Sequence, residues 1–199
     1  MLYLASQSPR RHELLARLCP GFEGVVLDIP EHRNAGETAE AYVRRVAREK
    51  AGAGLLQVVS DPGAVMLGAD TEVVLDDEVF GKPADAATAE AMLRRLSGRT
   101  HEVMSAVSLL SRSREAQALS VTRVTFAQLD DAQIRRYVAT GEPFGKAGGY
   151  AIQGGAEAFV TRLDGSYSGV MGLPLHETAG LLAEFGIGQA ADEAGNRAA

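Results

Sequence analysis

Short apolar runs and longer amphipathic segments alternate along this chain of 199 residues. A short apolar run, such as residues 65–67, is typical of a buried strand, whereas apolar residues three or four apart mark one face of a helix. Leu14, Leu15 and Leu18 show the helical spacing. On this pattern we expect strands at residues 2–5, 25–27, 65–67, 73–75, 78–80, 101–110, 119–126 and 158–163.

Five helices are predicted, and each begins at a residue suited to a helix N-terminus. Ser, Thr and Asp side chains accept hydrogen bonds from the free N–H groups of the first turn, and Pro fits the first helical position. The predicted helices start at Ser8, Thr38, Asp85, Asp130 and Pro174 and end near residues 18, 53, 96, 139 and 185.

The chain is organised around residues 65–83, which read VMLGADTEVVLDDEVFGKP. Gly68 and Ala69 remove side-chain bulk where the first apolar run ends, and Asp70 follows them. Asp76 and Asp77 suit a turn between two short strands. Asp70 has two interpretations. It either caps a turn, or it lies at the carboxyl end of a buried strand, where open α/β sheets bind ligands.

Composition narrows the classes of protein. The length suits one domain, which we expect over residues 1–188, followed by a disordered tail at 189–199. A net charge of −6 argues against a general nucleic-acid binder, and no apolar run approaches the length needed to span a membrane. The single cysteine, Cys19, excludes an internal disulfide framework, and a packed thiol is favoured over a nucleophile. We therefore expect a soluble cytoplasmic protein.

The basic residues are strongly biased towards arginine. Of the 20, 17 are Arg and only Lys50, Lys82 and Lys146 are Lys. Where lysine persists in such a chain, the position either needs a compact ammonium group, which suits phosphate oxygens, or kept its lysine by chance.

Two further stretches are suited to phosphate binding. Ser8, Pro9, Arg10 and Arg11 place a capped helix N-terminus and two cations directly after the first predicted strand, which makes an anion site. The alternative is a surface Arg pair beside an ordinary cap. Residues 145–155 are glycine-rich but lack the full pattern of a Walker or dinucleotide loop, so this signal is weak by itself.

Four stretches together resemble the Maf family of nucleotide pyrophosphatases. They are LASQSPRRHELL at 4–15, LGADTEVVLDDEVFGKP at 67–83, KAGGYAIQG at 146–154 and GSYSGVMGLPL at 165–175. The resemblance implies an α/β fold with a mixed twisted sheet, helices on its faces and two lobes around a central cleft, similar to ITP pyrophosphatases. It also implies a homodimer that hydrolyses a nucleoside triphosphate between its α and β phosphates with a divalent metal.

The resemblance assigns roles to individual residues. Asp70 matches the family's catalytic acid/base, and Arg10, Thr71 and Gln153 match the positions that separate its specificity classes. Polar residues of the cleft are matched by Ser8, Arg11, Glu31, Lys50 and Lys82. We expect Ser8, Arg11, Lys50 and Lys82 to bind phosphates.

The expected metal is Mg²⁺, with Mn²⁺ or Co²⁺ as substitutes, because the available ligands are carboxylates and phosphate oxygens. Asp70 and Glu31 are its predicted ligands, and Asp70 is also expected to orient or deprotonate the attacking water. His101 and His176 lie far from these motifs and are interpreted as structural.

Two positions depart from the family pattern. The family commonly has Asp directly before Lys146, where this chain has Gly145. Any metal or lysine contact of that Asp is therefore in question. Glu72 stands where an apolar residue is usual, which suggests that this face of the strand is exposed.

The identity of the base is predicted from three positions. Arg10, Thr71 and Gln153 all match the class that acts on dTTP and UTP, with CTP a further candidate. The class acting on 7-methyl-GTP tends to have Trp, Gln and Glu there. Alternatives are a purine-type pyrophosphatase acting on ITP or 7-methyl-GTP, and a non-catalytic nucleotide-binding regulator of cell division. No nucleic acid or membrane partner is expected.

Overall fold

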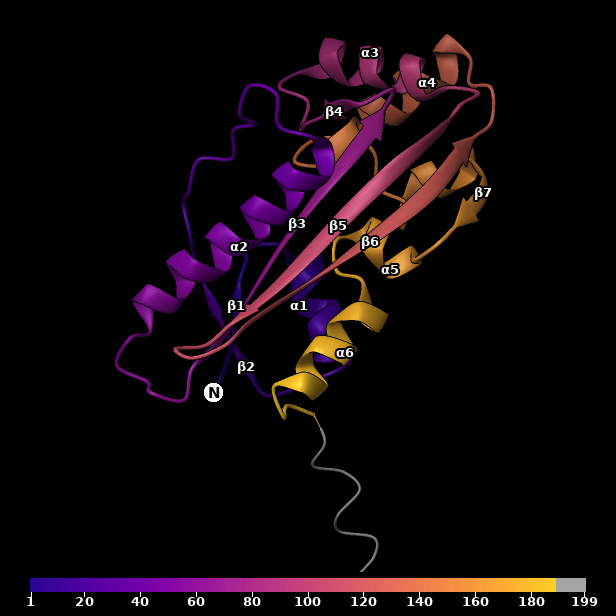
Figure 1. Cartoon of the computed structure of the whole chain (residues 1–199). Coiled ribbons are helices and arrows are strands. Elements are labelled where there is room, and N and C mark those ends of the chain that lie inside the picture. The colour runs from indigo at the N-terminus through magenta and orange to yellow at the C-terminus, as the bar shows by residue number, and fades with distance from the viewer. Residues whose placement is uncertain (189–199) are drawn as a thin grey trace, which may run out of the picture.

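One mixed sheet runs through the chain. The computed structural model describes residues 1–188, and the predicted tail at 189–199 lies outside the described residues. Seven strands pair in the order β2-β1-β3-β5-β6-β7, with β4 paired to β3 as well (Figure 1). The strands are β1 (Leu2–Ala5), β2 (Phe22–Val25), β3 (Val65–Leu75), β4 (Glu78–Phe80), β5 (Thr100–Leu110), β6 (Glu115–Phe126) and β7 (Val160–Asp164).

The sheet is parallel at one edge and antiparallel elsewhere. β1 pairs in parallel with both β2 and β3, and a helix connects each successive strand at this edge, as parallel pairing requires. β3, β5, β6 and β7 pair antiparallel. The prediction of an α/β fold with a mixed sheet is therefore confirmed.

Helices cover both faces of the sheet. They are α1 (Pro9–Ala16), α2 (Ala39–Gln57), α3 (Ala86–Leu96), α4 (Asp131–Ala139), α5 (Tyr167–Met171) and α6 (Leu175–Glu184), with short 3-10 helices η1 (Ala147–Gly149) and η2 (Gly155–Phe159). The predicted caps Thr38, Asp85 and Asp130 each accept a backbone N–H from the first turn. Ser8 is at the N-cap of α1, but its side chain makes no capping bond.

Alternate residues of β3 face the two helix layers on opposite sides of the sheet. Met66 packs with Ala51 of α2 on one face, and Gly68 lets α2 approach closely, because a Cβ there would collide with the carbonyl oxygen of Ala47. Leu67 lies on the other face, in the main core. Figure 1 shows α2 alone along its side of the long strands. The main core receives Leu14 of α1, Leu93 of α3, Ile134 of α4 and Leu181 of α6.

Several predicted boundaries were wrong. β3 is one strand of 11 residues, so Asp70 lies within it and not at its end. α2 continues through Gly52 and Gly54 to Gln57, because Gly54 packs directly against Met66. β2 occupies residues 22–25 instead of 25–27, β6 begins at Glu115, and α5 was not predicted.

A gap in the pairing of β3 divides the molecule into two lobes. Along one edge of β3, the pairing with β1 ends at Gly68, and the pairing with β4 begins at Val73. Within the described residues, 69–72 therefore pair only with β5, and we call this the open edge of β3. β1, β2, α1 and α6 form the β1 lobe at one end of the long strands, and β4, α3 and α4 form the β4 lobe at the other (Figure 1).

Candidate active site

A large cavity lies at the open edge of β3. Its volume is about 1040 Å³, and its walls come from both lobes, from residues 5–11 and 27–31 on one side and 142–154 on the other. Residues from both faces of β3 reach it, because no strand covers the edge between β1 and β4. It is lined by every residue to which the sequence assigns a role, namely Ser8, Arg10, Arg11, Glu31, Lys50, Asp70, Thr71, Lys82 and Gln153.

Asp70 is the most deeply buried acid of the cavity. Its relative exposure is 3%, and its side chain faces α2, where Lys50 donates a hydrogen bond of 2.8 Å to Oδ1. The other carboxylate oxygen, Oδ2, has no hydrogen-bond partner in the part of the chain that the structure describes. Lys50 is itself buried, and it lines the cavity together with Asp70.

Lys50 also joins Asp70 to the loop before α2. Its Nζ lies 2.8 Å from Oε1 of Glu31, and Nζ of Lys82 lies 3.5 Å from Oε2 of the same carboxylate. Burial alone would raise the pKa of Glu31, but the hydrogen bond from Lys50 and the charges of Lys50, Lys82 and Arg11 hold it below its usual range.

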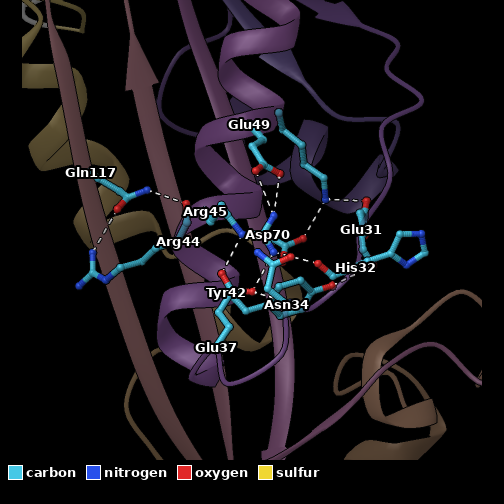
Figure 2. A network of polar contacts seen from close by, with 11 residues as sticks. Glu31, His32, Asn34, Glu37, Tyr42, Arg44, Arg45, Glu49, Asp70 and Gln117 are labelled. Carbon is cyan, nitrogen blue, oxygen red and sulfur yellow. Dashed lines mark hydrogen bonds and ion pairs between the residues drawn. The ribbon is translucent and has the colours of Figure 1, made fainter.

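A clamp of charged residues holds this loop against α2. Arg45 donates to both oxygens of Glu37, to both oxygens of Glu49 and to the carbonyl of His32 (Figure 2). Tyr42 donates to the carbonyl of Glu31 at 3.1 Å. The bonds from Arg45 and from a backbone N–H lower the pKa of Glu37 to about 2. Arg45 therefore ties residues 32–37 to α2.

Arg11 connects β3 to the turn after α5. Its Nε donates to the carbonyl of Gly172 at 2.8 Å, and its Nη2 donates to Oγ1 of Thr71 at 3.3 Å. Burial lowers the pKa of Arg11, while the negative charges of the cavity, with Asp70 the largest, oppose this shift. Because Thr71 also bonds Ser105 at 2.9 Å, its hydroxyl is largely satisfied by the protein.

Hydrogen bonds to Tyr137 and Glu142 hold the loop that carries Gln153 in place. Glu142 accepts hydrogen bonds from the N–H of Gly155 at 2.9 and 3.2 Å, and Tyr137 accepts one from the N–H of Ala151 at 2.9 Å. Ile152 is buried, whereas Gln153 is exposed and lines the cavity. An exposed amide on a well-anchored loop is suited to reading the edge of a base.

Gly145 has a conformation that explains part of its departure from the family pattern. Its φ is +73°, in the left-handed region that favours glycine. Without a carboxylate at this position, the ammonium of Lys146 bonds only the carbonyls of Glu142 and Phe144 within the described residues. Burial, and then the charge of Arg10, lower the pKa of Lys146.

Glu72 is the acidic cavity residue that sequence reasoning misjudged. It was expected on an exposed face, but its exposure is 7%, and its Oε2 has no hydrogen-bond partner. Burial, followed by the negative charges of Asp70 and Glu31, raises its pKa to about 8. Its spacing of two from Asp70 was the available signal, because residues i and i+2 of a strand share a face. The division of β3 into two short strands concealed it.

His101 and His176, which were interpreted as structural, and Cys19 do not line the cavity. His101 is 2% exposed and bonds the hydroxyl of Tyr150 at 2.8 Å, and burial lowers its pKa to about 4. His176 is exposed on α6. Cys19 is half-buried and packs against the main core.

The oxygen ligands in the cavity fit a hard divalent cation whose coordination is completed by substrate phosphates and water. No three His, Cys, Asp or Glu side chains within residues 1–188 are arranged to hold a metal ion by themselves. Mg²⁺ commonly uses only one or two carboxylates together with substrate phosphates and water. The unpartnered, buried Oδ2 of Asp70 is a suitable carboxylate oxygen.

These features define a class of protein. An α/β fold whose cleft combines a buried carboxylate with several Lys and Arg side chains is suited to bind and hydrolyse a phosphate-rich small molecule. No helix within residues 1–188 is long and apolar enough to span a membrane.

The chain belongs to the Maf family. The family model described as "Maf-like protein" matches residues 1–185, so the resemblance found in the four motifs is confirmed. A protein of Xanthomonas oryzae pv. oryzae named dTTP/UTP pyrophosphatase is 62% identical over 94% of this chain and 99% of its own length. A protein of Xylella fastidiosa named nucleoside triphosphate pyrophosphatase is 59% identical over 93% of this chain and 98% of its own length.

The solved structures with detectable similarity are more distant. A nucleoside-triphosphatase / dITP/XTP pyrophosphatase from Mycobacterium abscessus is 22% identical, with a TM-score of 0.44 over 64% of this chain and 74% of that chain.

Proposed function

We propose that this protein is a nucleoside triphosphate pyrophosphatase that hydrolyses dTTP and UTP to the monophosphate and pyrophosphate. The observation that carries the proposal is the buried Asp70–Lys50 pair in a cavity that also contains Arg10, Arg11 and Lys82. A triphosphate carries several negative charges, so its hydrolysis depends mainly on positioning and charge neutralisation. The relatives named dTTP/UTP pyrophosphatase, at 62% identity, support the same substrates.

Asp70 is the proposed catalytic residue. It orients the attacking water and accepts its proton as the water oxygen attacks a phosphoryl group and the linkage between the α and β phosphates breaks. The hydrogen bond from Lys50 fixes the carboxylate orientation. Arg11, Lys82 and the N-terminus of α1 beside Ser8 contribute positive potential for the phosphates.

Arg10, Thr71 and Gln153 are the proposed specificity residues. The Gln153 amide offers both a donor and an acceptor, which suits the mixed edge of thymine or uracil. Arg10 disfavours a cationic methylated purine by repulsion between like charges. Thr71 bonds Arg11, so we assign it an indirect contribution through the position of that guanidinium.

A divalent cation, Mg²⁺ or its substitutes Mn²⁺ and Co²⁺, is part of the proposal. When bound, such a cation neutralises phosphate charge and polarises the phosphoryl group. Asp70 would hold it with a second carboxylate, for which Glu31 and Glu72 are the two candidates in the cavity.

We also infer a cytoplasmic homodimer. The dimer is inferred from the resemblance to the family, and the cytoplasmic location is inferred from the composition. Sedimentation at micromolar concentration tests the dimer, since a single species of 21.0 kDa would contradict it.

A nucleotide panel tests the function. Pyrophosphate release is measured from dTTP, UTP, CTP, ITP and 7-methyl-GTP with Mg²⁺, using the parent protein and Asp70→Asn as the matched control. We expect dTTP and UTP to be preferred and 7-methyl-GTP to be poor, with Asp70→Asn folded but at least about 10²-fold slower. Preference for ITP or 7-methyl-GTP would indicate a purine enzyme. Absence of release from every nucleotide would favour the non-catalytic regulator.

A further inference from the structure

Two buried carboxylate oxygens of the cavity accept no hydrogen bond from residues 1–188. They are Oδ2 of Asp70 and Oε2 of Glu72, on residues whose exposures are only 3% and 7%. Removing a carboxylate oxygen from water without a partner is costly, and the negative charge of Asp70 adds to the cost of ionising Glu72. Both oxygens are therefore available to a positively charged ligand.

The two carboxylates lie on the same face of one strand. Asp70 and Glu72 are two residues apart in β3, so both face α2, with Cα atoms separated by about 6.6 Å. Both line the cavity at the open edge of β3. An ion between their carboxyl groups would also be accessible to a phosphate bound there.

Glu31, which the sequence favoured as the second metal ligand, is already neutralised. Lys50 lies 2.8 Å and Lys82 3.5 Å from its two oxygens. Glu72, in contrast, forms no salt bridge within the described residues, and Lys50 reaches only Oδ1 of Asp70. The pair with free oxygens is therefore Asp70 and Glu72.

We propose that Asp70 and Glu72, and not Asp70 and Glu31, are the two protein ligands of the divalent cation. The ligand chemistry is that of Mg²⁺ or Mn²⁺, which take carboxylate oxygens and complete their coordination with water and substrate phosphates. Glu31 instead positions Lys50 and Lys82. This proposal rests on the proposed function in one respect, namely that the protein binds a divalent cation.

Binding of Mn²⁺ to the full chain tests the assignment without turnover. Free Mn²⁺ is measured by electron paramagnetic resonance, without nucleotide and with the non-hydrolysable α,β-methylene analogue of dTTP. The variants are Glu72→Gln, Glu31→Gln and, as a matched control, Glu23→Gln, whose side chain is exposed on β2 outside the cavity.

We expect Glu72→Gln to weaken Mn²⁺ binding by about tenfold or more, and Glu31→Gln and Glu23→Gln to stay within about threefold of the parent. Unchanged binding in Glu72→Gln, or an equal loss in Glu31→Gln, would overturn the assignment. So would absence of Mn²⁺ binding by the parent under both conditions. Failure of the proposed function is a separate result, because it is an absence of pyrophosphate release.

A thermal measurement covers the case in which Glu72→Gln does not fold. A cation that binds only the native state raises the melting temperature. We expect Mn²⁺ to raise the melting temperature of the parent but not of Glu72→Val, in which a β-branched residue suited to a strand replaces the acid. An equal rise in both proteins would overturn the assignment.

Discussion

The ammonium of Lys50 holds two carboxylates in place at once, Asp70 and Glu31, each at 2.8 Å. A guanidinium is wider and planar and cannot take the place of a compact ammonium between them. We expect Lys50→Arg to fold and to lower kcat/KM for dTTP by about tenfold or more, because Asp70 loses its orientation.

Arg48→Lys is the matched control, since Arg48 lies on the same helix and pairs with Glu115 at the surface. Steady-state kinetics and thermal melting of both variants make the comparison. Parent-like kinetics in Lys50→Arg would show that a compact ammonium is not required at this position.

Gln153 has an exposed amide on an anchored loop, and its chemistry determines which base edge it can pair with. Gln153→Glu would place a carboxylate against the carbonyls of thymine, leaving unpaired acceptors that cost about 1–3 kcal/mol. We therefore expect kcat/KM for dTTP to fall by about tenfold or more. Gln57→Glu, an exposed change outside the cavity, serves as control. Equal dTTP kinetics in the two variants would remove Gln153 from base recognition.

At the level of elements, the clamp between α2 and the preceding loop determines where Glu31 lies. Arg45 bonds Glu37, Glu49 and the carbonyl of His32. We expect Arg45→Ala to release the loop and to lower dTTP turnover by about tenfold, since small displacements at a reacting centre have large effects.

Arg44→Ala tests whether any lost arginine of α2 has the same effect. Arg44 pairs with Glu40 and Gln117 away from the cavity, and an exposed pair of this kind contributes about 0.3–0.5 kcal/mol. We expect its turnover to match the parent. Similar turnover in Arg44→Ala and Arg45→Ala would contradict a specific role for the clamp.

The sequence predicted the presence of helices and strands better than it predicted their boundaries and continuity. Local signals identified the caps Thr38, Asp85 and Asp130, because these residues act within one helical turn. The continuity of β3 could not be predicted locally. Gly68 weakens a strand by propensity, and only the approach of α2 makes a glycine necessary there. The buried position of Glu72 was missed for the same reason.

For the candidate site too, the sequence predicted the residues but not the contacts that depend on the fold. The resemblance to the family identified nine residues that the structure brings to one cavity. Contacts made through the fold could not be predicted, such as those of Arg11 with Gly172, which is 161 residues away along the chain. A single sheet through residues 1–188 is consistent with one domain, which stays a prediction.

For the whole molecule, stability depends on pH through His101. Burial lowers its pKa to about 4, against 6.5 in an unfolded chain. Between these values the imidazole binds more protons in the unfolded state, so the contribution of His101 to stability is complete above about pH 6.5 and falls as the pH drops towards 4. The loss from this residue is about 3 kcal/mol.

Urea unfolding at several pH values measures this dependence. We expect His101→Gln, which keeps a hydrogen-bonding group near Tyr150, to lose less stability between pH 6.5 and 4 than the parent does. His176→Gln, an exposed change on α6, is expected to follow the parent. Identical slopes for the parent and His101→Gln would show that His101 does not titrate between the two states.

The open edge of β3 has a mechanical consequence. β3, β5 and β6 continue from one lobe into the other, so the two walls of the cavity are joined by paired strands. Any bending of one lobe against the other must be absorbed as twist in these strands. Residues 69–72, which pair only with β5 among the described residues, carry Asp70, so this twist passes through the segment that holds the carboxylate. The width of the cleft and the direction of the Asp70 carboxylate are therefore coupled.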